Sequence, residues 1–263
     1  SRGTSADWTT SRQLRAGQAA GHQAFAVDTR GKGRSAHPTA RAGYADNDEA
    51  RDVLALATAL GWAHYQLVGY SRGSIIAARV LVLDPRVSAA VLGGMGDAFT
   101  DPHWPRREAF ARALSGSGQR PDPALAGFLR SVQERGLDRQ TLAWQQQAQP
   151  STSPAALATI RVPVLVISGE ADHDNGSAEA LARLLPRATV QRGPAVPCTP
   201  GTRRTVAPGQ RAASASADPL SWAAAPGITS TGPRIVARGG GEGLGRARRS
   251  PVQGGGAPPR ARD

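Results

Sequence analysis

The chain has 263 residues, of which 40% are hydrophobic, and its net charge is +12. Its one cysteine, Cys198, excludes an internal disulfide framework and a cysteine-based metal cage. The most apolar stretch, residues 75–83, contains Arg79 and is far shorter than the run of about 18 apolar residues that indicates a membrane helix. The chain opens at Ser1 with no apolar signal segment, so we expect a cytoplasmic location and no membrane partner.

Arginine supplies nearly all of the positive charge, since Lys32 is the only lysine. Such a bias is typical of GC-rich coding as much as of a charged partner. The basic clusters near the carboxyl end have no interleaved aromatic residues, and we therefore expect no specific nucleic-acid partner.

The composition changes near Arg192. The 71 residues from 193 to 263 include 13 Gly and 10 Pro, with 10 Arg against 3 acidic residues. A segment so rich in Gly and Pro buries too few side chains to offset the entropy lost on ordering. We expect residues 193–263 to be a mostly unstructured tail and residues 1–192 to form the folded domain.

Short apolar runs alternate with helical patterns along residues 1–192, which is typical of a parallel sheet covered by helices. The runs predict strands at residues 23–28, 65–70, 89–93 and 162–168. The helical patterns predict a helix from Asp46 or Asn47 to Gly61, and others over residues 74–83 and 177–185. Residues 97–158 have helical patches and no strand pattern, so we expect a helical cap over the carboxyl ends of the strands.

The clearest local motif is Gly69-Tyr70-Ser71-Arg72-Gly73, a G-x-S-x-G between a predicted strand and a predicted helix. A serine hydroxyl becomes a useful nucleophile when a tight strand-to-helix turn exposes its oxygen beside backbone N–H groups. Gly69 and Gly73 leave room for that turn, which forms a nucleophile elbow. The motif predicts Ser71 as a nucleophile.

A second motif, Asp-Thr-Arg-Gly-Lys-Gly-Arg-Ser at residues 28–35, follows the first predicted strand. It lacks the spacing of a phosphate-binding loop. Together with the serine motif some forty residues later, it resembles the D-x-R-G-x-G-x-S loop of the α/β-hydrolase superfamily. The resemblance runs from about Thr4 to about Arg192 and is strongest to small esterase-like members.

This resemblance implies an α/β-hydrolase fold, a mostly parallel sheet flanked by helices, with Ser, Asp and His in that chain order. Asp172, in the turn after the strand at 162–168, is the implied acid, and Asp97 is the second candidate. The N–H of Arg72 is the implied oxyanion donor. The implied substrate is a small ester or related acyl compound, with no cofactor. Consecutive residues of a turn point in different directions, so we expect no metal at residues 170–174.

The implied histidine is not found. The chain has His22, His37, His64, His103 and His173, and only His173 follows Asp172, as its immediate neighbour. A histidine directly next to Asp172 cannot easily be oriented by that carboxylate and also reach Ser71. His22 and His64 precede predicted strands, at the sheet end opposite Ser71, and His103 in the cap is the first alternative base.

The pattern is also incomplete at both ends. Relatives begin with a strand ending in His-Gly that carries a second oxyanion donor, and we expect the sheet here to lack it. In a shifted reading frame, the codons around Pro197-Cys198-Thr199 permit Pro-Gly-Ser-Ala-Met-His, a histidine loop. We hypothesise that a frameshift replaced the last strand and the histidine.

Two classes of function follow. The first is a serine hydrolase of small acyl substrates. The second is a catalytically silent fragment or binding module, while a cofactor-free haloperoxidase or carbon-carbon hydrolase of the same fold stays open. Trp104, Phe110 and Trp144 are candidates to line an apolar pocket or to pack the cap.

Overall fold

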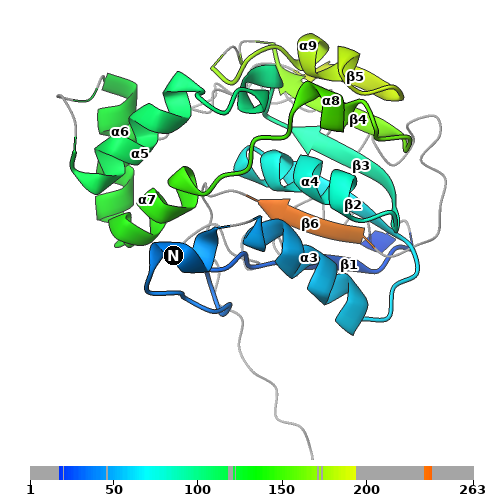
Figure 1. Ribbon diagram of the computed structural model, residues 1–263, viewed down its shortest axis with the longest axis horizontal. Helices are drawn as coiled ribbons and strands as arrows, with labels where there is room; N and C mark the ends of the chain where they lie inside the picture. The colour runs from blue at the N-terminus through cyan, green and yellow to red at the C-terminus, as the bar shows by residue number, and fades with distance from the viewer. Residues whose placement is uncertain are drawn as a thin grey trace, which may run out of the picture.

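The computed structural model describes residues 18–19, 21–45, 47–117, 121, 123–170, 172, 174–193 and 234–238. Its strands are β1 Ala24–Val27, β2 Tyr65–Tyr70, β3 Val87–Gly93, β4 Val164–Gly169, β5 Ala188–Gly193 and β6 Arg234–Arg238. They form one sheet in the order β1-β6-β2-β3-β4-β5, and every pairing is parallel (Figure 1). All six strands therefore end at the same edge.

The helices outside the predicted cap lie on one face of this sheet (Figure 1). They are α3 Asp48–Ala59, α4 Arg72–Leu83, α8 Pro154–Leu157 and α9 Ala178–Arg183. α4 packs directly on β2 and β3, and α3 and α8 pack on α4. α4 is apolar around most of its circumference, because it is covered by the sheet on one side and by these helices on the other.

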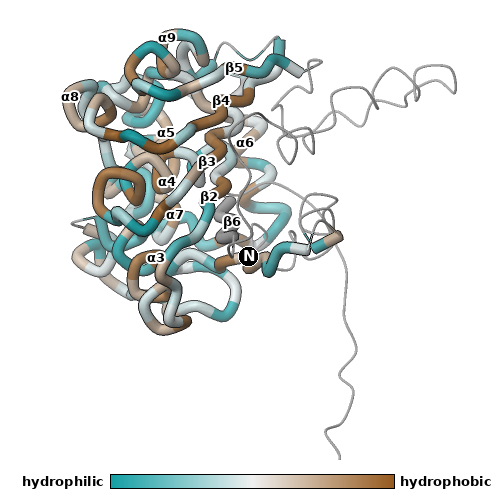
Figure 2. The backbone as a smooth tube through the Cα atoms, turned by 90° about the vertical axis from the view of Figure 1, so that its right-hand side faces the viewer, coloured by the Kyte–Doolittle hydropathy of each residue, from teal (hydrophilic) through white to brown (hydrophobic). Residues whose placement is uncertain are grey.

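The main core lies between the sheet and α4. Tyr65, Leu67 and Leu92 from the strands meet Ile75 and Ile76 of α4, and each is at most 1% exposed. Hydrophobic stretches accordingly run through β2, β3 and β4 in the middle of the molecule (Figure 2). A mostly apolar run of this kind is the reason that the sequence predicts both ends of β2 correctly.

The predicted cap consists of helices α5 Pro105–Ser115, α6 Pro123–Glu134 and α7 Arg139–Gln147, which lie to one side of the sheet (Figure 1). Arg107 of α5 fastens the two connections of this cap to each other. Its guanidinium donates to the carbonyl of Asp101 (2.8 Å) in the segment before the cap. It also donates to the carbonyl of Gln149 (3.1 Å) and the hydroxyl of Ser151 (2.8 Å) in the segment after the cap. Burial lowers the pKa of Arg107, and these oxygens compensate for the lost water.

The expectation of an unstructured tail is wrong for Arg234–Arg238, which form β6 between β1 and β2. Two open strand edges face each other there, and a short run with Ile235 and Val236 at its centre fits between them. The remaining expectations for residues 194–233 and 239–263 lie outside the described residues.

Other bounds differ by a few residues. β4 begins at Val164 instead of residue 162, and α4 begins at Arg72, directly after Ser71. Asn47 precedes α3 but caps it with no side-chain hydrogen bond, while Asp46 lies outside the described residues. Over the part of the chain that is described, none of the helices has both the length and the hydropathy to cross a bilayer.

Candidate active site

Ser71 lies at the junction of β2 and α4 with φ 53° and ψ −124°, a conformation that residues with a side chain rarely adopt. Its N–H donates to the carbonyl of Gly93 (2.7 Å), and its carbonyl accepts from the N–H of Ser74 (2.8 Å). A Cβ added at Gly69 would lie 2.4 Å from the carbonyl oxygen of Gly73. The sharp turn therefore requires glycine at 69 and places Ser71 just beyond the carboxyl end of β2.

Arg72 is the first residue of α4. The N–H groups of a first helical turn have no acceptor within the helix, and together they present partial positive charge. The N–H of Arg72 directly follows Ser71 in the chain. It is thus in the position where an oxyanion donor is expected.

Asp172 lies at the same edge of the sheet. Its N–H donates to the carbonyl of Gly169 (3.1 Å) in the turn after β4, two strands away from Ser71. Hydrogen bonding to Glu179 raises the pKa of Arg192 on β5, and the nearby Asp172 carboxylate raises it further.

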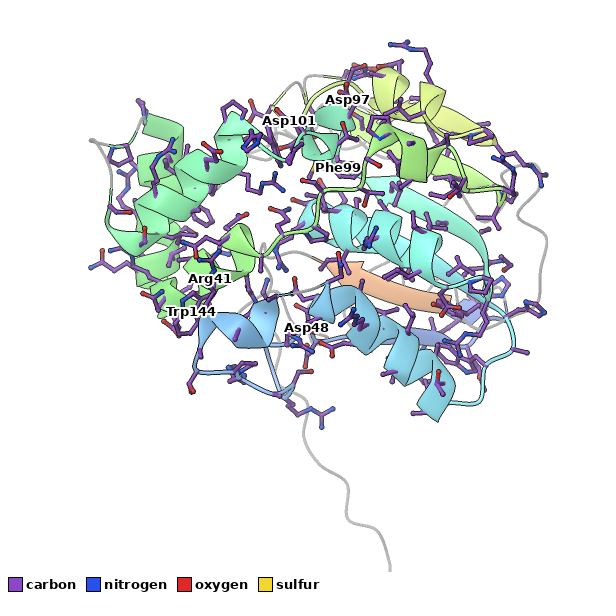
Figure 3. The ribbon with its side chains drawn as sticks, in the orientation of Figure 1. Arg41, Asp48, Asp97, Phe99, Asp101 and Trp144 are labelled. Atoms are coloured by element: carbon purple, nitrogen blue, oxygen red, sulfur yellow. The ribbon has the colours of Figure 1, made fainter. Side chains whose placement is uncertain are left out.

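The second acid candidate, Asp97, has a structural partner. It belongs to the 3-10 helix η2 Asp97–Thr100, which lies beyond the end of β3 together with the buried Phe99 (Figure 3). Its Oδ1 accepts a hydrogen bond from the N–H of Ser177 (2.8 Å). The carboxylate therefore fastens η2 to the amino end of α9.

The side chain of Arg72 forms a buried ion pair with Glu49 of α3 that the sequence patterns do not reveal. The two side chains are 11% and 6% exposed, and both guanidinium Nη atoms bond the two carboxylate oxygens. Nη2 also donates to the carbonyl of Gln145 on α7 (3.3 Å). The residue that follows the nucleophile thus joins the elbow to α3 and to the cap. Glu49 lies on the buried side of α3. A charged residue on a buried helix face needs a partner of opposite charge, and this is the only signal in the sequence that points to the ion pair.

The loop at residues 28–35 lies beside this pair. Its Arg30 binds Asp52 through Nε (2.7 Å) and Nη2 (2.6 Å), and Asp48 through Nη1 (2.6 Å). These bonds, chiefly the one to Asp52, raise the pKa of Arg30. Gln145 donates from Nε2 to the carbonyl of Arg30 (2.8 Å), so the cap is held to this loop as well. In this structure the motif at residues 28–35 holds the loop to α3 and to the cap.

Glycine is required at two places in the same loop. A Cβ on Gly31, at φ +75°, would lie 2.8 Å from both the Tyr44 hydroxyl and Thr141 Cγ2. One on Gly33 would lie 2.2 Å from Oδ2 of Asp28, the oxygen that accepts from the N–H of Arg34 (3.2 Å). The loop therefore closes on Asp28 and leaves α7 close above it.

Buried polar atoms gather around the elbow. Thr29 Oγ1, Arg72 Nε and Gln145 Oε1 have no hydrogen-bond partner within the part of the chain that is described. Thr29 and Gln145 are 3% and 1% exposed. Buried polar atoms are normally paired, so a polar ligand or water is their natural complement.

The histidines that the structure describes are engaged elsewhere. The ring of His37 lies 3.3 Å from the carbonyl of Gly33, measured from Nε2. His103 is 86% exposed, and its Nδ1 lies 3.9 Å from Oε1 of Glu108. Neither contact involves Ser71.

His22 and His64 precede β1 and β2, at the edge opposite Ser71. His173 lies outside the described residues. Across the described ranges, the Ser71 hydroxyl forms no hydrogen bond. The structure thus brings Ser71, the Arg72 N–H and Asp172 to one edge, without a described histidine at the hydroxyl.

The cap aromatics pack instead of lining a pocket at Ser71. Phe110 meets Phe128 with ring centroids 4.8 Å apart, and Trp144 stacks on Tyr44 at 6.1 Å, beside Arg41 in the view of Figure 3. Trp104 packs against the main core. A pocket of about 560 Å³ lies within the cap, lined by Pro121, Ala126, Leu129, Arg130, Gln133, Leu137 and Arg139. It includes none of the predicted site residues.

Residues 1–209 match the family model described as the alpha/beta hydrolase family. Among curated proteins, a carbamate hydrolase candidate, RutD of Variovorax paradoxus, is 40% identical over 92 residues. That alignment covers 34% of this chain and only 33% of RutD, so this chain matches about a third of that relative.

Solved structures share the arrangement of the sheet and helices. Rv0554 from Mycobacterium tuberculosis superposes with a TM-score of 0.58 at 24% identity, covering 73% of this chain and 78% of that one. A bromoperoxidase from Bacillus anthracis superposes with a TM-score of 0.51 at 20% identity, covering 72% and 79%. At such identities the likeness concerns the fold alone.

Proposed function

Because this chain belongs to the alpha/beta hydrolase family and has the predicted α/β-hydrolase fold, we propose that it carries a serine acyl-transfer site for small esters or related acyl compounds. Ser71 is the nucleophile, the Arg72 N–H is an oxyanion donor and Asp172 is the acid. The observation that carries the proposal is the strained backbone of Ser71 at the strand-to-helix turn, since an unfavourable conformation persists only where the surrounding structure imposes it. The name of RutD supports carbamates as one such acyl class.

The reaction follows from these positions. Ser71 Oγ attacks the substrate carbonyl carbon and gives its proton to a base, while the carbonyl oxygen becomes an oxyanion that accepts from the Arg72 N–H. The leaving alkoxide takes the proton back from the protonated base, which leaves an acyl group on Ser71. Water then attacks the acyl carbon and gives a proton to the same base. The bond between the acyl carbon and Ser71 Oγ breaks, Oγ takes the proton from the base, and the free acid and Ser71 are restored. The Asp172 carboxylate orients the base and stabilises its positive form.

Among the described residues, no histidine lies at the Ser71 hydroxyl to act as its base. The described histidines contact Gly33 and Glu108 or lie at the opposite edge, and a serine hydroxyl without a base remains protonated at neutral pH. Added imidazole has the same acid-base group as histidine. If the site is otherwise complete, imidazole should serve as its base.

A fluorophosphonate probe tests the proposal, since it reacts with an activated serine. With imidazole present, we expect peptide mass spectrometry to locate the phosphonyl group on Ser71, and we expect no labelling of that peptide in Ser71→Ala. Asp172→Asn should slow the labelling about 100-fold, because the neutral amide stabilises imidazolium poorly, whereas Asp174→Asn, an exposed neighbour, should label normally. Labelling of another residue, or none at any imidazole concentration, would exclude Ser71 as the nucleophile.

A further inference from the structure

The place of β6 in the sheet carries an inference that does not depend on catalysis. β1 and β2 follow each other along the chain, yet they are not neighbours in the sheet. All four residues of β1 pair with β6, from Ala24 with Arg234 to Val27 with Ala237. On its other side, β6 pairs with β2 from Gln66 to Tyr70. β1 is thus joined to the sheet through β6.

The spacing of strands explains why β1 cannot pair directly with β2 in this sheet. Neighbouring strands lie about 4.8 Å apart, so strands with one strand between them are about 10 Å apart and cannot bond each other. The two edges that face β6 each present a row of backbone N–H and C=O groups. Such groups need partners when they are removed from water, and an open strand edge recruits an extended segment.

The strand in this position comes from far along the chain. β5 ends at Gly193, and β6 begins at Arg234. Its sequence, Arg-Ile-Val-Ala-Arg, places β-branched residues at the centre and is flanked by Pro233 and Gly239. A short, well-delimited strand of this kind matches the length of β1 and β2.

We propose that the edges of β1 and β2 form a strand-binding slot whose ligand is the chain's own segment Arg234–Arg238. The slot recognises an extended peptide with a β-branched centre by parallel main-chain pairing. Covalent connection through residues 194–233 is not needed for this binding. β6 is a docked segment that fastens β1 to the rest of the sheet.

The slot also fixes the position of the loop that follows β1. Ala237 pairs with both Val27 and Gly69, so the register of β6 aligns the end of β1 with the end of β2. The loop at residues 28–35 begins directly after β1, and its Arg30 is held by Asp48 and Asp52 beside the elbow. Loss of β6 should therefore loosen this loop as well as β1.

Cleavage of the full chain tests the slot. A recognition site for a sequence-specific protease is inserted between Gly209 and Gln210, and the purified protein is cut under native conditions. We expect the fragment that contains β6 to elute with the body in size-exclusion chromatography and to separate only in denaturant. In a control with the site between Gly255 and Gly256, the released peptide lacks β6 and should separate at once.

A strand-breaking substitution shows whether retention depends on β6. Proline has no N–H, and a strand between two others uses every N–H for pairing, so Val236→Pro should release the cut fragment, whereas Val252→Pro should not. In the uncut Val236→Pro chain, amides of β1 should exchange with deuterium at least about tenfold faster, with β3 unchanged. The slot is disproved if the cut fragment separates from the body under native conditions, or if the cut fragment that carries Val236→Pro stays bound to the body. None of these measurements uses catalysis, so they remain decisive if the proposed function fails.

Discussion

Replacing Glu49 by Leu should lower the free energy of unfolding by about 3 kcal/mol, because it leaves the guanidinium of Arg72 buried without its carboxylate. The Arg72 side chain is only 11% exposed, and it would keep the carbonyl of Gln145, at 3.3 Å, as an acceptor. Urea unfolding followed by circular dichroism measures the loss. Glu108→Leu is the control, since Glu108 is 45% exposed beside Arg112 and its loss should cost about 0.5 kcal/mol or less.

The double variant separates the ion pair from other effects of Glu49. Because Glu49→Leu combined with Arg72→Met leaves no unpaired charge, it should recover most of the lost stability. If the double variant loses as much stability as Glu49→Leu and Arg72→Met lose together, the two side chains are not coupled. A loss in Glu49→Leu no greater than in Glu108→Leu would contradict the role of this ion pair in holding the elbow to α3.

Gly69→Ala should reduce imidazole-dependent labelling of Ser71 about 100-fold, the loss expected when a reacting group is displaced by about 1 Å. Its Cβ would lie 2.4 Å from the carbonyl oxygen and 2.6 Å from the carbonyl carbon of Gly73, and backbone atoms cannot move aside as a flexible side chain can. Stability should fall by about 1–3 kcal/mol as well. The rate of fluorophosphonate labelling is the measurement.

Gly116→Ala is the matched control for Gly69→Ala. Gly116 has φ +76° with nothing within 4 Å of its added Cβ, so alanine there is strained but meets no neighbour. We expect it to cost about 1 kcal/mol and to leave the labelling rate unchanged. If Gly69→Ala labels Ser71 as fast as the control does, the close approach of β2 and α4 does not position the nucleophile.

Most of the domain could be predicted because its elements have local signals. The strand Tyr65–Tyr70 is a mostly apolar run, and the G-x-S-x-G motif places the turn between it and α4. The helical character of the cap follows from its periodic patches. Bounds such as the start of β4 at Val164 shift because pairing with β3, and not the apolar run, decides where a strand begins.

Features that depend on distant residues could not be predicted. Nothing in the sequence connects Glu49 with Arg72, since only the packing of α3 against α4 brings them together. The β6 strand cannot be predicted because its five residues lie in a segment rich in Gly and Pro, and the average composition of this segment outweighs the short β-branched run. Its place in the sheet depends on two edges that form only after folding.

The rate of p-nitrophenyl acetate hydrolysis, measured with and without imidazole in the native chain and in Ser71→Ala, tests the central claim that the site is complete except for its base. Without imidazole, we expect the two proteins to be equally slow. With imidazole, only the native chain should gain a protein-dependent rate, and this gain should rise as the pH increases through the pKa of imidazole, because the neutral base then forms. A Ser71-dependent rate in the absence of imidazole would contradict that claim, because it would show that a histidine of the chain already acts as the base.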